Sequence, residues 1–162
     1  MAYDSLGVAN ALLDQAKAQG KMLDPLQLQK LLYFAHGWHL ALTKKPLLDE
    51  FIEAWTYGPV VPNVYHAFKI CGSGYIKGRA RSQTDPESTA PRPDDHFVIA
   101  LLDRIIETYG DKHGLDLVKM THTENSPWAK TLRANAGLHG ADIKNEDIQS
   151  YFEQLMETSR AS

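Results

Sequence analysis

The spacing of apolar residues in the 24–62 segment predicts the element around which the rest of the chain is organised. Asp24 is placed as a helix N-cap, Pro25 as the first helical residue, and Gln27 at the position that completes a capping box. Apolar residues then recur at helical intervals, at Leu28, Leu31, Leu32, Ala35, Trp38 and Leu42. Aromatic residues widen this stripe beyond one face, so we expect a core helix over 25–42 that is covered on most sides.

A short strand and another helix are expected directly after this core helix. Lys44 to Pro46 ends the helix, and residues 51–57 alternate with a period of two and are rich in aromatic side chains. This pattern favours a single strand that Gly58-Pro59 breaks. Pro62 can then occupy the first position of a helix over about 62–70.

The remaining periodicities complete a mostly α fold. They predict helices over about 5–19, 97–110 and 115–121, one that begins at Pro127, and a last one that follows Asn145 and frays beyond Thr158. A second short strand is expected near 141–144. Residues 1–162 therefore read as a single globular domain of about six helices around the central hydrophobic helix 25–42, with one or two short β-strands.

One segment differs in character. Residues 72–95 are rich in glycine, proline and small polar side chains, which bury too little surface to order such a stretch alone. We expect a flexible loop there. Loops of this length are either functional or solvated insertions, and both interpretations stay open.

Composition restricts the class of protein without identifying it. Of the 162 residues, 43% are hydrophobic and 23% charged, and the formal net charge of −3 provides no general attraction for nucleic acid or anionic lipid. The single cysteine excludes an internal disulfide and fits a reducing compartment. No signal-peptide pattern and no apolar run of roughly 18 residues is present, so a soluble cytoplasmic protein is expected.

Seven histidines raise the possibility of a metal site. His36 and His39 lie three residues apart on the core helix, and His122 with Glu124, or His66, could complete a set of ligands. No HExxH motif supports this arrangement, and histidines inside an aromatic helix commonly form structural hydrogen bonds. We expect no metal ion and no other cofactor.

Catalytic and nucleic-acid-binding signatures are equally sparse. Cys71 has no local partner pattern for nucleophilic catalysis, and Ser73 lies in a glycine turn outside any GxSxG motif. The sequence therefore predicts no enzyme. Lys77, Arg79 and Arg81 lie near Tyr75 and could follow a nucleic-acid backbone, but three loop charges are more often solvated, so we do not expect nucleic acid as a partner.

Three blocks of the chain resemble the Panacea antitoxin domain family, the SocA-like group that includes phage-associated GepA-like proteins. The first is LQKLLYFAHGWHL continuing through EAWTYGPVVP to residue 69, the second is HTE followed by PW at 122–128, and the third is the 143–152 segment. The 72–95 stretch lies outside the resemblance. Most of the matching residues belong to the capped core helix, the strand and the Gly-Pro corner, so we interpret them as determinants of the fold.

The resemblance implies an antitoxin of a type II toxin–antitoxin system, which neutralises a cognate protein toxin by direct binding. One alternative is a proteolytic adaptor that delivers the toxin to the ClpXP protease. A further alternative is a metal-binding phage-associated protein or an enzyme. No membrane partner is expected.

The partner surface is predicted from loops and exposed aromatics, because recognition commonly uses loops on a rigid scaffold and anchors of Tyr, Trp and Arg. We expect toxin contacts near the end of the strand and along the 71–95 loop. The candidate residues are Trp55, Tyr57, Pro59, Tyr75, Lys77, Arg79 and Arg81.

Overall fold

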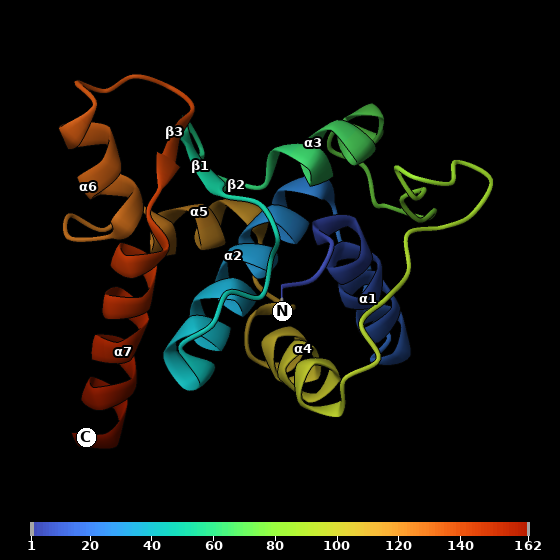
Figure 1. Cartoon of the computed structure of the whole chain (residues 1–162), viewed down its shortest axis with the longest axis horizontal. Coiled ribbons are helices and arrows are strands. Elements are labelled where there is room, and N and C mark those ends of the chain that lie inside the picture. Colours follow the sequence, from blue (N-terminus) through green and yellow to red (C-terminus); the bar gives the residue numbers. More distant parts are fainter. Residues whose placement is uncertain (1, 162) are drawn as a thin grey trace.

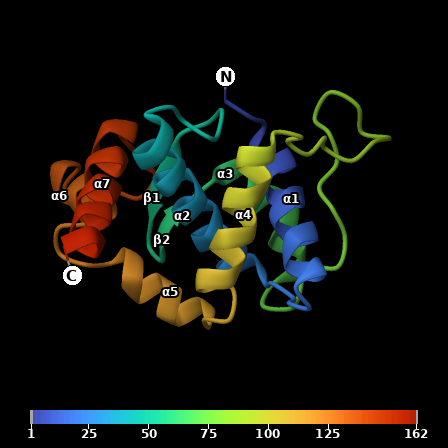
Figure 2. The same cartoon turned by 90° about the horizontal axis from the view of Figure 1, so that it is seen from below.

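The computed structural model describes residues 2–161 and places one helix, α2, at the centre of the molecule (Figure 1). The helices are α1 (Ser5–Ala18), α2 (Pro25–Thr43), α3 (Pro62–Phe68), α4 (His96–Tyr109), α5 (Gly114–Thr121), α6 (Pro127–Ala134) and α7 (Asn145–Ala161), with a 3-10 turn at Lys69–Cys71. Seen from below, α7 lies on one side of α2, α4 and α1 lie on the other, and α5 lies beneath (Figure 2). The predicted mostly α class is confirmed.

The start of α2 forms as the sequence predicts. The Gln27 backbone N–H donates to Asp24 Oδ1 at 2.8 Å, and the Asp24 N–H donates to Gln27 Oε1 at 2.9 Å, which is a complete capping box. At the other end Lys44 adopts the left-handed conformation with φ of 64°. The helix continues one residue beyond the predicted end, to Thr43.

Aromatic rings join α2 to its two neighbours. The Phe34 ring stacks on Tyr109 of α4 with 4.4 Å between centroids, and Phe152 of α7 meets Trp38 edge-on at 5.2 Å. Gly37 lies beneath the Phe152 ring, where a Cβ atom would come within 2.2 Å of a ring carbon. The absence of a side chain at Gly37 therefore allows α2 and α7 to approach closely.

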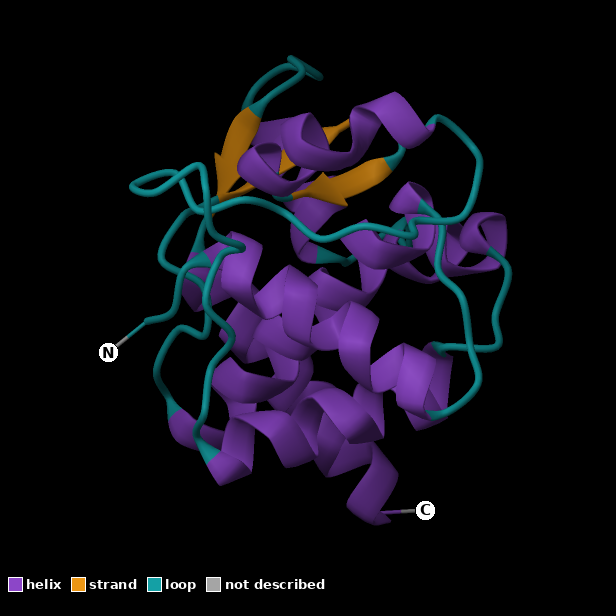
Figure 3. Cartoon of the chain, turned by 90° about the vertical axis from the view of Figure 1, so that its right-hand side faces the viewer, coloured by secondary structure: helices purple, strands orange, loops and turns teal. Residues whose placement is uncertain are grey.

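A three-stranded antiparallel sheet lies at one end of the helical body (Figure 3). Its strands are β1 (Ile52–Trp55), β2 (Gly58–Val60) and β3 (Ala141–Ile143), in the order β2-β1-β3. The β1–β2 register pairs Trp55 with Gly58, and β3 pairs with β1 on the opposite edge.

The sheet corrects the sequence prediction of one strand broken at Gly58-Pro59. The chain instead turns at residues 56–57 and continues as β2, so the described residues contain three strands instead of one or two. Gly58 has φ of 108°, a conformation that glycine adopts without a Cβ penalty. Pro59 fits because β2 is an edge strand, where a missing N–H donor is tolerated.

Two helix boundaries also differ from the expectations. The α7 helix continues to Ala161, and the residues beyond Thr158 that were expected to fray are helical up to that point. The helix expected over 62–70 ends at Phe68 and tightens into the 3-10 turn.

No helix within residues 2–161 combines the length and apolar character needed to cross a membrane.

The 72–95 segment runs beside α1 and is attached to it by side chains. The Asn10 amide donates to the carbonyls of Ala80 and Ala90 at 3.0 and 3.1 Å and accepts from the Ala80 N–H at 2.8 Å. Asp14 forms ion pairs with Arg79 and Arg92 at 2.7 and 2.9 Å. These contacts show how a stretch without its own core is held: a buried asparagine and one carboxylate of α1 provide its partners.

Candidate functional site

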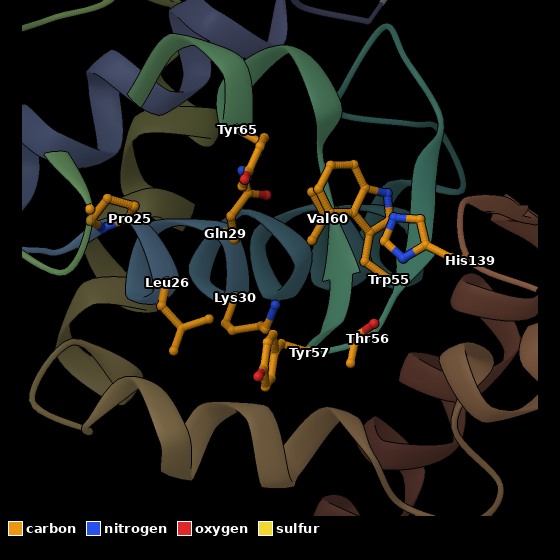
Figure 4. Close-up of a pocket in the computed structure, with 11 residues that line it drawn as sticks. Pro25, Leu26, Gln29, Lys30, Trp55, Thr56, Tyr57, Val60, Tyr65 and His139 are labelled. Carbon is orange, nitrogen blue, oxygen red and sulfur yellow. The ribbon is translucent and has the colours of Figure 1, made fainter. Parts of the chain in front are cut away.

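A pocket of about 430 Å³ opens between the start of α2, the β1–β2 turn, α3 and the loop before β3 (Figure 4). We call it the aromatic pocket. It is lined by Pro25, Leu26, Gln29, Lys30, Trp55, Thr56, Tyr57, Val60, Tyr65, Gly72 and His139. Its size, its largely apolar lining and its few polar groups are typical of a binding site.

Trp55 forms the best-supported wall of the pocket. Its ring lies 4.8 Å from Tyr65 in an edge-on arrangement and 4.8 Å from His139, and its Nε1 donates to Glu53 Oε1 at 2.9 Å. The Trp55 backbone carbonyl accepts a 2.7 Å hydrogen bond from Trp128 Nε1. The end of β1 is thus fixed from two sides, and the indole is held in one orientation.

Two tyrosines provide the accessible part of the rim. Tyr57, in the β1–β2 turn, is 65% exposed, and Tyr65 of α3 is 40% exposed. Exposed tyrosines beside a fixed tryptophan supply apolar contact area with few rotatable bonds to immobilise. The pocket rim can therefore bind another molecule with little reorganisation of its own.

Lys30 provides the most unusual side chain of the pocket lining. It is fully buried, and its ammonium donates to the Pro59 carbonyl at 3.0 Å. No carboxylate within residues 2–161 forms an ion pair with it. Burial without an acidic partner lowers the pKa of Lys30 to about 7.

A second basic group faces the same region. The His122 ring stacks on Trp128 with 3.8 Å between centroids, and its buried Nε2 has no hydrogen-bond partner within the described structure. Desolvation, and then the charge of Lys30, lower the pKa of His122. A Cβ atom at Gly58 would lie 3.2 Å from Lys30 Cε, 3.4 Å from His122 Nε2 and 2.7 Å from Thr121 Oγ1, so these side chains converge behind the turn.

The structure separates the residues that the sequence singled out. Trp55 and Tyr57 line the aromatic pocket, whereas Pro59 is buried in β2 and contributes its carbonyl to Lys30. The four loop candidates lie elsewhere. Lys77 and Arg79 border a second hollow against the end of α1, Tyr75 is 60% exposed, and Arg81 donates to the Glu87 carbonyl at 3.2 Å.

Sequence reasoning identified Trp55 and Tyr57 and missed the other members of the pocket, of which Lys30, Tyr65 and His139 carry ionisable side chains. Lys30 did carry a signal, because it is a charged residue directly before the apolar run LLYFA of a helix expected to be buried on most sides. Tyr65 falls among the apolar positions Val61, Val64 and Phe68 of its helix, a pattern that indicates packing and not binding. His139 lies in a loop whose proximity to β1 depends on the β1–β3 pairing, which the pattern of single residues does not specify.

Two histidines of the metal hypothesis, His36 and His39, have other partners. His36 Nδ1 accepts from the Leu48 N–H at 3.3 Å, which leaves Nε2 to donate to Asn145 Oδ1 at 2.9 Å. His39 Nδ1 lies 2.7 Å from the Lys45 carbonyl. Within residues 2–161, no three His, Cys, Asp or Glu side chains gather at metal-binding distance.

Comparisons with known proteins agree with the resemblance of the sequence blocks. The family described as antitoxin SocA-like, Panacea domain, matches residues 28–129. The antitoxin SocA of Caulobacter vibrioides (strain NA1000 / CB15N) is 38% identical over 128 residues, which cover 77% of this chain and 68% of the relative. No solved structure matches. The matched range contains α2 from Leu28 onward, the β1–β2 hairpin and α3, which together supply most of the residues that line the aromatic pocket.

Proposed function

Because the chain belongs to the SocA-like Panacea antitoxin family, we propose that it is the antitoxin of a type II toxin–antitoxin system and neutralises a cognate protein toxin by binding it directly. In this proposal the protein acts in the cytoplasm as a binding module and carries out no catalysis. The family supports the role of an antitoxin. The mode of action is inferred from the surface described above.

The observation that carries the proposal is the aromatic pocket and its rim. Protein interfaces derive much of their affinity from a few Trp, Tyr and Arg residues beside a pocket. Trp55, Tyr57 and Tyr65 meet this description, and they lie on β1, the β1–β2 turn and α3. We therefore place the centre of the toxin interface at this pocket.

The loop candidates lie outside the aromatic pocket, and we propose that they contribute at the periphery of the interface. Gly72, the first residue of the loop, lines the aromatic pocket, and Tyr75 follows three residues later with an exposed ring. Lys77, Arg79 and Arg81 extend along the loop beside α1. Arg79 already pairs with Asp14 of α1, and Arg81 donates to the Glu87 carbonyl within the loop. We therefore expect these side chains to contribute less to the toxin affinity than the pocket does.

The test is co-expression with the protein encoded by the adjacent reading frame, scored by growth and by recovery of a complex. The wild-type chain is expected to restore growth. Tyr57→Ala removes an exposed ring that forms no hydrogen bond within residues 2–161, so the fold of the variant is expected to be unchanged. Its affinity for the toxin is expected to fall by about 30-fold or more.

Leu42→Ala is the matched control for that variant. Leu42 is 49% exposed at the opposite end of α2, where it borders a different hollow. Its replacement removes a comparable apolar group and should leave affinity and growth unchanged. Equal losses from both variants would contradict the placement of the interface, and failure of the wild-type chain to restore growth would contradict the proposed function.

The same experiment distinguishes two modes of neutralisation. Direct occlusion predicts that toxin accumulates in complex with the antitoxin, in cells with or without ClpXP. If growth returns only when ClpXP is present and the toxin disappears, the protein is a proteolytic adaptor and the binding step alone does not neutralise.

A further inference from the structure

We propose that the aromatic pocket is a carboxylate-binding site, in which an acidic side chain of the bound toxin pairs with the Lys30 ammonium while the aromatic rim contacts the apolar part of the same segment. This proposal rests on the proposed function for the identity of its occupant. It adds that the bound segment of the toxin must carry a carboxylate.

The first argument is the shortage of partners around Lys30. A lysine ammonium has three donors, and the structure provides one acceptor, the Pro59 carbonyl at 3.0 Å. Buried charges in proteins are normally paired with an opposite charge. No carboxylate in residues 2–161 fills this role, so an acidic group from another molecule would supply the missing partner.

The second argument is the sign of the surrounding groups. His122, at the end of α5, faces Lys30 from behind the turn, and Tyr57 faces it from the turn itself. His139 is the other basic residue of the pocket lining, and the lining contains no Asp or Glu. The ionisable groups of the lining, together with His122, are therefore basic or phenols, and the nearby Glu53 carboxylate lies outside the lining and accepts from the Trp55 indole. This arrangement favours an anionic occupant over a cationic or a neutral one.

Access to Lys30 requires a movement of one exposed side chain. Figure 4 shows the Lys30 amine and the Tyr57 ring projecting into the same part of the pocket. Tyr57 is 65% exposed and Lys30 is fully buried, and in our proposal rotation of the tyrosine ring admits the ligand oxygen to the Lys30 ammonium. In the bound state the ring would then cover the new ion pair and exclude water from it.

Titration provides the third argument. In the free protein Lys30 is only partly protonated near neutral pH, because its pKa lies at about 7. A carboxylate beside it favours the charged form and raises the pKa again. Binding of the acidic group should therefore be accompanied by uptake of a proton at Lys30 above pH 7, whereas a neutral occupant would cause none.

The direct test uses the whole chain and two small probes, phenylacetate and its neutral analogue phenylacetamide. Binding is followed through the indole N–H signals of Trp55 and Trp128, assigned with single Trp→Phe variants. We expect saturable shifts with phenylacetate and at least about tenfold weaker binding of phenylacetamide. Equal binding of the two probes, or no saturable shift with either, would overturn the carboxylate site.

Lys30→Met extends the test to the toxin. It removes the charge and keeps an unbranched apolar side chain in a buried position, and the fold is checked by its thermal unfolding. The proposal predicts that this variant loses the preference for phenylacetate and fails to restore growth. If wild type and variant restore growth equally, the carboxylate site is wrong and the proposed antitoxin function stands.

The reverse pair of results, carboxylate binding without toxin binding, also distinguishes the two hypotheses. A wild-type protein that prefers phenylacetate but binds no toxin would refute the antitoxin proposal and leave the carboxylate site in place. Toxin binding measured in two buffers of different ionisation enthalpy at pH 8 adds an independent readout. Proton uptake by wild type that is absent in Lys30→Met supports the ion pair, and identical uptake in both contradicts it.

Discussion

Replacing Gly37 with alanine is expected to destabilise the protein, although alanine is the better helix former. Gly37 lies within α2 beneath the Phe152 ring of α7. A Cβ atom there would lie 2.2, 2.4 and 2.6 Å from three atoms of that ring, whereas ordinary contacts begin at 3.4 Å. The ring would have to retreat by about 1 Å from a fully buried position between Tyr33, Phe34 and Trp38.

The expected change in the free energy of unfolding follows from two opposing effects. Overpacking a close-packed core costs about 1–3 kcal/mol, and the overlap at Gly37 favours the upper part of this range. Replacing a helical glycine with alanine, by itself, stabilises the helix by up to about 1 kcal/mol. We therefore expect Gly37→Ala to lower the free energy of unfolding by roughly 1–2 kcal/mol.

Phe152→Ala supplies the background in which the reasoning is tested. Alone it should cost about 3–5 kcal/mol, because it removes a fully buried aromatic ring. Once the ring is gone, the overlap disappears and only the helix preference remains. Gly37→Ala should then stabilise the Phe152→Ala protein by about 0.5–1 kcal/mol, which reverses its sign.

The assay is urea unfolding of all four proteins, followed by circular dichroism and compared at constant m-value. A destabilising effect of Gly37→Ala in both backgrounds would refute the explanation, since it would show that the cost does not come from Phe152. A stabilising effect in the wild-type background would show that the close approach of α2 and α7 is not required.

Three further predictions follow from the buried polar groups. Asn10→Ala removes three hydrogen bonds to the 72–95 segment and should increase proteolytic cleavage within 81–89, measured against the wild-type rate. Burial lowers the pKa of His36 to about 4, so between pH 4 and 6.5 the unfolded state binds more protons than the folded state. The protein should therefore lose stability as the pH falls through this window. His36→Gln should weaken this pH dependence of the free energy of unfolding, measured by urea titration. The lowered pKa of Lys30 has the same sign at higher pH, so wild-type stability relative to Lys30→Met should rise from pH 7 towards pH 10 by up to about 1.4 kcal/mol per pH unit.

Local patterns predicted the elements that carry their own signals. The capping box at Asp24, the helical spacing in α2 and the start of α6 at Pro127 depend on neighbours within a few residues, and all three formed as expected. The Gly58-Pro59 pair was read as a break because both residues disfavour strands. It begins an edge strand, because the pairing with β1 makes the positive φ of Gly58 and the missing N–H of Pro59 acceptable.

The candidate site could be predicted only in part for the same reason. Trp55 and Tyr57 belong to one short aromatic stretch and were identified together. Lys30, Tyr65 and His139 come from separate elements, and their approach depends on pairings and helix contacts between distant parts of the chain. A buried lysine without an acidic partner also weakens the fold, and proteins retain such costs mainly where a site needs them.

Hydrogen exchange of the toxin complex would test the location of the interface most directly. Peptides that cover the β1–β2 turn around Tyr57, the α3 region around Tyr65 and the start of α2 should exchange more slowly when toxin is bound. Peptides from the exposed face of α4 and from the last turns of α7 should be unchanged. Protection confined to α4 and α7, with the aromatic pocket unaffected, would contradict the account.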